Sequence, residues 1–217
     1  MLWIYTVMLM GIVIRADSTS NSSESGYNIH KQEEIYKSLF KLKHSEQLKV
    51  VKQIISKADY AKQFKMVQII IDGMIKVVMG PAKVLLENSG YFPGEDFPVS
   101  EEAKDALSLV VENTVLFSEI LLRLPDITHR HLKRLKETSS VFKWGIVFCN
   151  ESHLMDATRK KLLSLAAQEL EMVPKSPNYV NPFRFSATQD KEIVEPVKVK
   201  KKKTRVRGPQ LSKNSEL

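Results

Sequence analysis

The sequence is poor in the residues and motifs on which enzymes and metal centres are usually built. Its single cysteine rules out an intrachain disulfide, and its 8 glycines form neither a phosphate-binding loop nor a Gly-x-Ser-x-Gly elbow. No His-Glu-x-x-His segment occurs, and His129 and His131 would point to different faces of a helix. We therefore expect a protein that acts by binding, with no catalytic residue, no metal and no cofactor.

Long hydrophobic runs are also scarce. The run over residues 2–14 is too short to span a bilayer, which takes about 20 apolar residues, but it fits the core of a signal peptide, which takes about 7 to 15. Ile14 and Ala16 suit the small-residue positions of a cleavage site, so residues 1–16 are predicted to form a signal peptide. No later segment is long and apolar enough to cross a bilayer, so we expect the protein not to span a membrane.

The net charge of +8 is concentrated at one end of the chain. Residues 198–217 contain eight basic residues and one acid, so the rest of the chain is nearly neutral. A nucleic-acid-binding domain carries its charge on a folded face, and this tail has no interleaved aromatic residues, so no nucleic-acid partner is expected. Two interpretations stay open for the tail: contact with an acidic protein surface or lipid headgroups, or a solvated segment that aids solubility. The contacts would come from Lys200, Lys201, Lys202, Lys203, Arg205 and Arg207.

Between these ends, apolar residues recur at spacings of three and four, which is the pattern of amphipathic helices. The first helix is predicted from near His30, with a core-facing stripe that begins with Ile35, Leu39 and Leu42. Asp59 is predicted to cap a second helix, which Gly80-Pro81 ends or kinks. A short apolar turn over residues 84–86 and a loop over residues 88–98 follow.

The third helix, capped by Ser100, is apolar on more than one face, so we expect it to be central; Pro125 stops it. Asp126 is predicted to cap a short basic helix over residues 127–136, and Asp156 a last helix through Leu170. The apolar segment over residues 141–149 resembles a buried strand as well as a helix, but its isolation among helices favours a helix.

These patterns predict an all-α fold: a compact bundle of about five to six helices over residues 30–173. A disordered linker over residues 17–29 precedes it, and an extended segment over residues 174–185 follows it. The basic tail, residues 186–217, is predicted to be disordered.

Three side chains in the predicted bundle bear on chemistry. Cys149 lies in an apolar string, so a buried core residue is favoured over a reactive thiol. Glu112 and Glu119 are seven residues apart on one side of the third helix, where two partly buried carboxylates could act as an acid/base pair. A structural ion pair between Glu119 and Arg123, four residues later, is favoured instead.

Two Asn-x-Ser sequons and the last residues bear on the secretory pathway. Asn21 and Asn150 become candidate glycosylation sites behind a signal peptide, and Asn150 stands just before a polar loop. The chain ends in Ser215, Glu216 and Leu217, which shares its final Glu-Leu with the lumenal retrieval signals. The chain is therefore expected in the endoplasmic reticulum lumen, outside the cell, or in both.

Several separate blocks, in order, resemble the coiled-coil domain-containing protein 134 family. They are EIYKSLFKLKHSEQL (34–48), DALSLVVENTVLF (105–117) with LRLP (122–125), WGIVFCNES (144–152), SLAAQEL (164–170), NPF (181–183) and RGPQLSKNSEL (207–217). The resemblance leaves out the N-terminal linker, and the basic tail is shorter than in the family.

The resemblance implies a helical protein without enzymatic activity, resident in the endoplasmic reticulum or secreted. It implies a glycan at Asn150, retrieval by a receptor through the Ser-Glu-Leu ending, and a partnership with the lumenal chaperone endoplasmin. In that role the protein protects endoplasmin from hyperglycosylation and degradation. The alternative is a secreted, cytokine-like regulator that dampens MAP-kinase signalling. For the contact surface, we favour the basic tail and the loop from Gly90 to Pro98.

Overall fold

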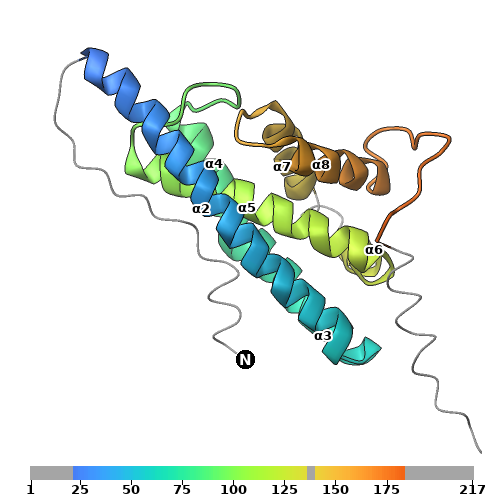
Figure 1. Cartoon of the computed structure of the whole chain (residues 1–217). Helices are drawn as coiled ribbons and strands as arrows, with labels where there is room; N and C mark the ends of the chain where they lie inside the picture. Colours follow the sequence, from blue (N-terminus) through green and yellow to red (C-terminus); the bar gives the residue numbers. More distant parts are fainter. Residues whose placement is uncertain (1–21, 136–139, 184–217) are drawn as a thin grey trace, which may run out of the picture.

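The computed structural model describes residues 22–135 and 140–183, and these form an all-α bundle without strands (Figure 1). The fold class predicted from the periodicity is therefore confirmed. The helices, in chain order, are α2 (Ser22–Lys57), α3 (Tyr60–Gly73), η1 (Met74–Met79), α4 (Gly80–Ser89), α5 (Glu101–Arg123), α6 (Pro125–Arg134), α7 (Ser140–Glu151) and α8 (Ala157–Glu169).

The first helix begins earlier than predicted. α2 starts at Ser22, inside the segment expected to be a linker. Ser and Asn are weak helix formers, but extending an existing helix adds one hydrogen bond per residue, whereas starting one requires a costly nucleus. The long amphipathic part of α2 supplies that nucleus.

The first part of the α2 stripe, which was predicted to face the core, is wrong, although Val51 farther along the stripe is buried. Ile35, Leu39 and Leu42 are 43%, 38% and 61% exposed, whereas Tyr36 and Phe40 are fully buried. The Tyr36 ring lies 5.9 Å from that of Phe40 and 5.5 Å from that of Phe97 in the loop before α5. The helix carries two adjacent apolar stripes, and the inward one buries the larger aromatic surfaces.

The helix interrupted by Gly80-Pro81 neither stops nor breaks. α3 continues through the π-helical turn η1 into α4, so residues 84–86, predicted as a short apolar turn, are helical. Pro81 has no N–H to donate, and its ring would clash with a carbonyl one turn earlier in a regular helix. The wider turn avoids this clash, with the Gly80 N–H bonded to the Ile75 carbonyl. A Cβ on Gly80 would lie only 2.9 Å from that carbonyl oxygen.

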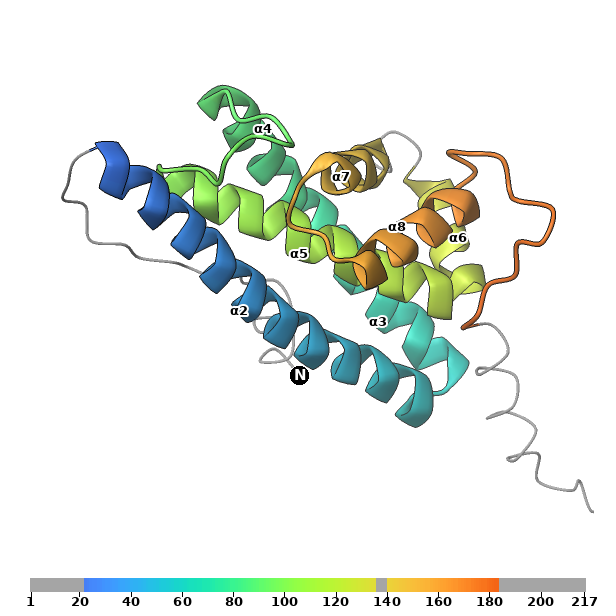
Figure 2. The same cartoon turned by 45° about the horizontal axis from the view of Figure 1, so that its top comes forward.

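Helix α5 forms the centre of the bundle, as predicted. Figure 2 shows it running between α2 on one side and α7 and α8 on the other, and it also packs against α4, η1 and α6. Almost every side chain from Ala103 to Leu122 is buried. Its predicted cap is confirmed, since the Ser100 hydroxyl accepts a hydrogen bond of 3.1 Å from the Ala103 N–H.

The remaining helices largely follow their local signals. The segment 140–151 is a helix, and the Asp156 carboxylate caps α8 by accepting a bond of 2.8 Å from the Arg159 N–H. Asp126 does not cap α6, because Pro125 already occupies the first helical position, which suits its fixed φ angle. Asp126 instead lies in the first turn, where the helix dipole favours an acid.

Residues 174–183 have no helix and lie against the end of α5. The Asn181 side-chain amide donates a bond of 2.7 Å to the Leu122 carbonyl, and the Phe183 ring centroid lies 3.9 Å from the Arg123 guanidinium. The Tyr179 hydroxyl donates a bond of 2.7 Å to Glu169 on α8. Three separate contacts thus hold this segment on the bundle.

Candidate functional site

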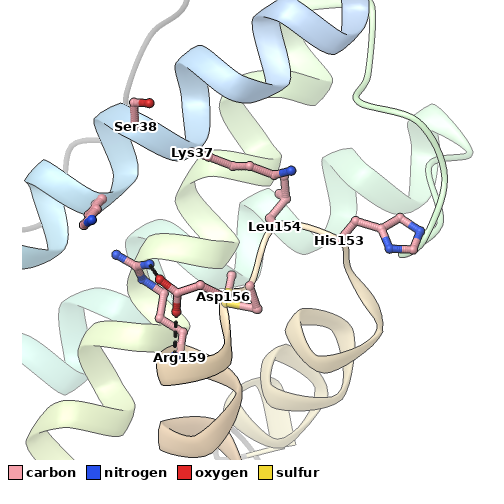
Figure 3. Close-up of a pocket in the computed structure, with 8 residues that line it drawn as sticks. Lys37, Ser38, His153, Leu154, Asp156 and Arg159 are labelled. Carbon is pink, nitrogen blue, oxygen red and sulfur yellow. Dashed lines mark hydrogen bonds and ion pairs between the residues drawn. The ribbon is translucent and has the colours of Figure 1, made fainter.

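A recessed basic cleft lies between α2 and the loop that joins α7 to α8 (Figure 3). Its volume is about 350 Å³. Two segments that are far apart in sequence meet in it, and its lining residues are Lys37, Ser38, Lys41, His153, Leu154, Met155, Asp156 and Arg159. We call this feature the basic cleft.

Arg159 is the buried cation of the basic cleft. Only 6% exposed, it forms an ion pair through Nη1 with Asp156, and its guanidinium lies 4.6 Å from the centroid of the Phe40 ring. Its Nε is buried and has no hydrogen-bond partner among the described residues. A buried N–H donor without an acceptor is unusual in a folded protein, and a ligand or water often supplies the missing partner.

The lysines at the rim of the cleft differ in their partners. Lys37 pairs with Glu33 at 2.7 Å and with Glu34 at 3.0 Å, whereas Lys41 is exposed and forms no ion pair within the described residues. Burial lowers the pKa of Lys37, but the two carboxylates more than compensate and the net shift is upward. The charge of Lys37 is therefore already neutralised by its two glutamates, whereas Lys41 has no acidic partner within the described residues.

The loop that was predicted as a contact surface lies next to the basic cleft. The His153 Nε2 donates a bond of 3.0 Å to the carbonyl oxygen of Gly94, which ties the loop before α5 to the loop before α8. A second hollow of about 660 Å³ runs along this loop, between Ile29 on α2 and Val99. Phe92, at the loop's outer edge, is 66% exposed. The loop and the cleft thus belong to one stretch of surface.

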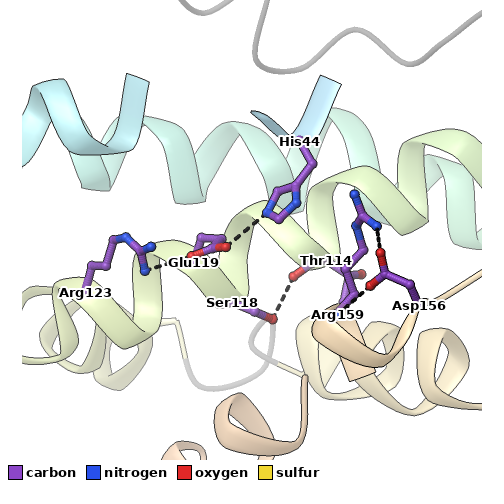
Figure 4. Close-up of polar contacts among 7 residues, drawn as sticks. All are labelled: His44, Thr114, Ser118, Glu119, Arg123, Asp156 and Arg159. Atoms are coloured by element: carbon purple, nitrogen blue, oxygen red, sulfur yellow. Dashed lines mark hydrogen bonds and ion pairs between the residues drawn. The ribbon is translucent and has the colours of Figure 1, made fainter. Parts of the chain in front are cut away.

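Glu119 forms a bridge between two helices. Its Oε1 lies 3.0 Å from the His44 Nε2 on α2, and its Oε2 lies 2.8 Å from Nη1 of Arg123 (Figure 4). The predicted pairing with Arg123 is confirmed, and His44 is an additional partner that the sequence did not indicate. The carboxylate, 6% exposed, ties α2 to α5 and does not line the basic cleft.

Glu112 is fully buried in the centre of α5. Burial raises the pKa of the neighbouring Tyr36 hydroxyl well above its ordinary value, and the charge of Glu112 raises it further. Glu112 lies near Tyr36 in the core, whereas Glu119 bridges His44 and Arg123, so the two carboxylates of one helix lie in different surroundings. Neither of them lines the basic cleft.

Cys149 is buried, as predicted, on the inner face of α7. Burial raises the pKa of its thiol to about 12, and a hydrogen bond with Thr114 only partly opposes the shift. The thiol is consequently protonated and unreactive at neutral pH, because only the thiolate is nucleophilic.

His129 and His131 face different neighbours, as their spacing predicts. The His131 Nε2 donates to the Phe64 carbonyl at 3.1 Å, whereas His129 lies 3.3 Å from Glu169 on α8. Within the described ranges, no group of three or more His, Cys, Asp or Glu side chains is arranged to hold a metal.

Asn150 lies exposed in the last turn of α7, where an attached glycan would point into solvent. The sequon's Ser152 is buried, with its hydroxyl donating a bond of 3.0 Å to the Cys149 carbonyl. Glycosylation of Asn150 stays a prediction. Asn21, the signal peptide, the cations at 200–207 and the ending at 215–217 all lie outside the described residues.

A family model described as "ERK and JNK pathways, inhibitor" matches residues 21–212, a range that includes every described helix. The chain is 37% identical over 153 residues to coiled-coil domain-containing protein 134 of Xenopus tropicalis, and 35% identical over 156 residues to that of Mus musculus. The alignments cover 70% and 71% of this chain. The chain belongs to the coiled-coil domain-containing protein 134 family.

The alignments span 66% of the frog relative and 68% of the mouse relative. No solved structure matches the chain. Across the part of the chain that is described, no helix combines the length and the apolar character needed to cross a bilayer.

Sequence reasoning did not single out the residues that form the basic cleft in this family member. Lys37 and Lys41 lie among other charged residues on α2, a pattern typical of a solvated helix face. Arg159 follows a helix cap and reads as an ordinary first-turn residue. The one local signal is that Arg159 stands in the first turn of α8, where the positive end of the helix dipole disfavours a cation.

Proposed function

We propose that this chain is a non-enzymatic binding protein that restrains signalling through the ERK and JNK pathways. The observation that carries this proposal is the match of the family model over residues 21–212, because the match extends over the whole described bundle. The second line of support is the family relationship to the two curated relatives.

The polar interior favours binding over catalysis. Glu119 is already engaged by His44 and Arg123, and Cys149 is a protonated thiol without access to solvent. The basic cleft presents charged groups at the surface, among them Lys41, which has no ion-pair partner within the described chain. Such a surface is suited to recognising a partner by complementary charge.

We further propose that the protein works in the secretory pathway, in the endoplasmic reticulum lumen or after secretion. The support is the predicted signal peptide over residues 1–16, the exposed Asn150 and the Ser-Glu-Leu ending. In this setting the effect on ERK and JNK would be indirect, through the supply or activity of receptors upstream of the kinases.

The test is a signalling assay in cultured cells that lack their own copy of the protein. The full chain, tagged internally so that Leu217 stays terminal, is compared with a chain lacking Ser215, Glu216 and Leu217 and with an empty vector. After growth-factor stimulation, phosphorylated ERK and JNK are expected to fall in cells that express the full chain. Unchanged phosphorylation at equal expression would contradict the proposal. Distribution between cells and medium, measured in parallel, tests the proposed location.

A second candidate function is the protection of endoplasmin, which the Ser-Glu-Leu ending and the resemblance to coiled-coil domain-containing protein 134 favour. In the same cells, loss of the protein would then lower the amount of endoplasmin and increase its glycosylation. Re-expression of the full chain would restore both. If endoplasmin is unaffected while ERK and JNK phosphorylation respond, the two candidates are separated.

A further inference from the structure

We propose that the basic cleft binds an acidic side chain of a protein partner, with the carboxylate held between Lys41 and Arg159. The proposal concerns the chemistry of the ligand and holds whichever pathway the partner belongs to. It can therefore fail while the proposed signalling role stands, and the reverse is also true.

The charges of the cleft favour an anion. Among the lining residues, Lys37, Lys41 and Arg159 are cationic and Asp156 is the one carboxylate. Glu33 and Glu34 neutralise Lys37 from outside the cleft, and Asp156 pairs with Arg159. The charge that stays available is that of Lys41, which has no acidic partner in the described part of the molecule.

Arg159 supplies an independent reason. Its guanidinium is fixed in place by Asp156 and by the Phe40 ring, yet its Nε–H has no acceptor among the described residues. A donor that is held rigidly and left without an acceptor is prepared for a ligand atom, because binding need not order it first. A carboxylate oxygen forms a charge-assisted hydrogen bond with a guanidinium, which is about twice as strong as a bond between neutral groups.

The shape of the cleft favours an acidic side chain over a larger anion. A volume of about 350 Å³ accommodates one or two side chains. Leu154 and Met155, each 6% exposed, form an apolar floor on which the methylene groups of a glutamate can pack. The cleft is recessed between α2 and the α7–α8 loop (Figure 3), so a flat membrane surface would meet its rim and not its floor.

The first experiment measures binding of a fluorescein-labelled hexaglutamate peptide to the full chain by fluorescence anisotropy at low salt. Lys41→Gln is compared with Lys49→Gln, which removes the same charge from an exposed position of the same helix outside the cleft. Because both variants keep the basic tail, its contribution to binding cancels in the comparison. Loss of one charge-assisted contact is expected to weaken binding about tenfold in Lys41→Gln, and less than about twofold in Lys49→Gln.

Arg159→Lys provides a second variant that keeps the positive charge and the pairing with Asp156 but removes the Nε–H donor. It is also expected to weaken binding of the peptide by about tenfold, because lysine lacks the planar array of donors. Circular dichroism and the thermal midpoint show whether the variant keeps its fold. Should Arg159→Lys unfold, the Lys41 comparison alone decides.

Three results would overturn the proposal. The first is no binding of hexaglutamate to the wild-type chain, and the second is an equal loss in Lys41→Gln and Lys49→Gln, which would assign binding to overall charge. The third uses phosphatidylserine vesicles as a parallel probe: if Lys41→Gln reduces binding to vesicles but not to the peptide, the cleft recognises a lipid surface. A hexalysine peptide should not bind in any variant.

Discussion

Gly145 is the position where a single methyl group should disturb this fold most clearly. It lies on α7 where this helix contacts α5, and a Cβ added there would lie 2.4 Å from the Thr114 Oγ1 and 2.9 Å from the Met79 Cε. Ordinary contacts of a Cβ begin at 3.4 Å, so Gly145→Ala requires α7 and α5 to separate by about 1 Å or Thr114 to change its rotamer. Thr114 is fully buried, so a change of its rotamer would have to be accommodated by the packed side chains around it.

Two opposing effects set the size of the change. Replacing a helical glycine by alanine stabilises the helix by about 1 kcal/mol, whereas overpacking a buried contact costs about 1–3 kcal/mol. We expect Gly145→Ala to lower the free energy of unfolding by about 1–2 kcal/mol, since the steric contact is too short to relax without moving a helix. Urea denaturation followed by circular dichroism measures this quantity.

A double-mutant cycle with Thr114→Ala tests the cause. Without the Thr114 hydroxyl, the shortest contact is gone and the close neighbour that stays is the flexible end of Met79, so Gly145→Ala should cost less in that background than in wild type. The single Thr114→Ala variant accounts for the cost of truncating Thr114 itself. A Gly145→Ala variant as stable as wild type, or more stable, would refute the steric reasoning, and an equal cost in both backgrounds would show that Thr114 is not the obstacle.

Three further predictions concern buried polar groups. At pH 8, Cys149 should react with Ellman's reagent roughly a thousandfold more slowly in the native protein than in urea. A pKa of about 12 leaves far less thiolate in the native protein than the ordinary pKa of 9.0 leaves in the unfolded chain. Equal rates would show an accessible thiol. Glu119→Gln should destabilise the protein by about 3 kcal/mol in denaturant titrations, since it removes the charge that holds both His44 and Arg123; an unchanged midpoint would mean that the bridge contributes little. Burial raises the pKa of Glu169, but hydrogen bonds with Tyr179 and His129 lower it by more, so the net shift is downward. The resulting stability is present above the ordinary pKa of 4.5 and is lost as pH falls through the folded value, so Tyr179→Phe should destabilise the protein at pH 7 and much less at pH 3; an equal difference at both pH values would contradict this.

The basic cleft could not be predicted because its parts are far apart in sequence. Lys41 belongs to α2 and Arg159 to α8, and each looks like a solvated charge in its own segment. They share a cleft only because both helices pack on α5. The same limit applies to His44, whose partner Glu119 lies on another helix, whereas the pairing of Glu119 with Arg123 is predictable from their spacing of four.

The sequence by itself determined where most helices form and where they begin. Asp59, Ser100 and Asp156 each accept a backbone hydrogen bond within three residues, so the signal and its effect lie in one short segment. The burial of α5 and of Cys149 also follows from local composition, because their segments are apolar on more than one face.

Only the tertiary structure decided which stripe of α2 faces inward and how the chain passes Pro81. Ile35 and Tyr36 are adjacent apolar residues, and the choice between their stripes depends on the shape of the surface that α5 and the loop at Phe97 present. Whether a proline ends a helix or is absorbed in a π-helical turn depends on how much packing on both sides would be lost by breaking it. Both outcomes are set by contacts between segments that are distant in the chain, and such contacts leave no local pattern in the sequence.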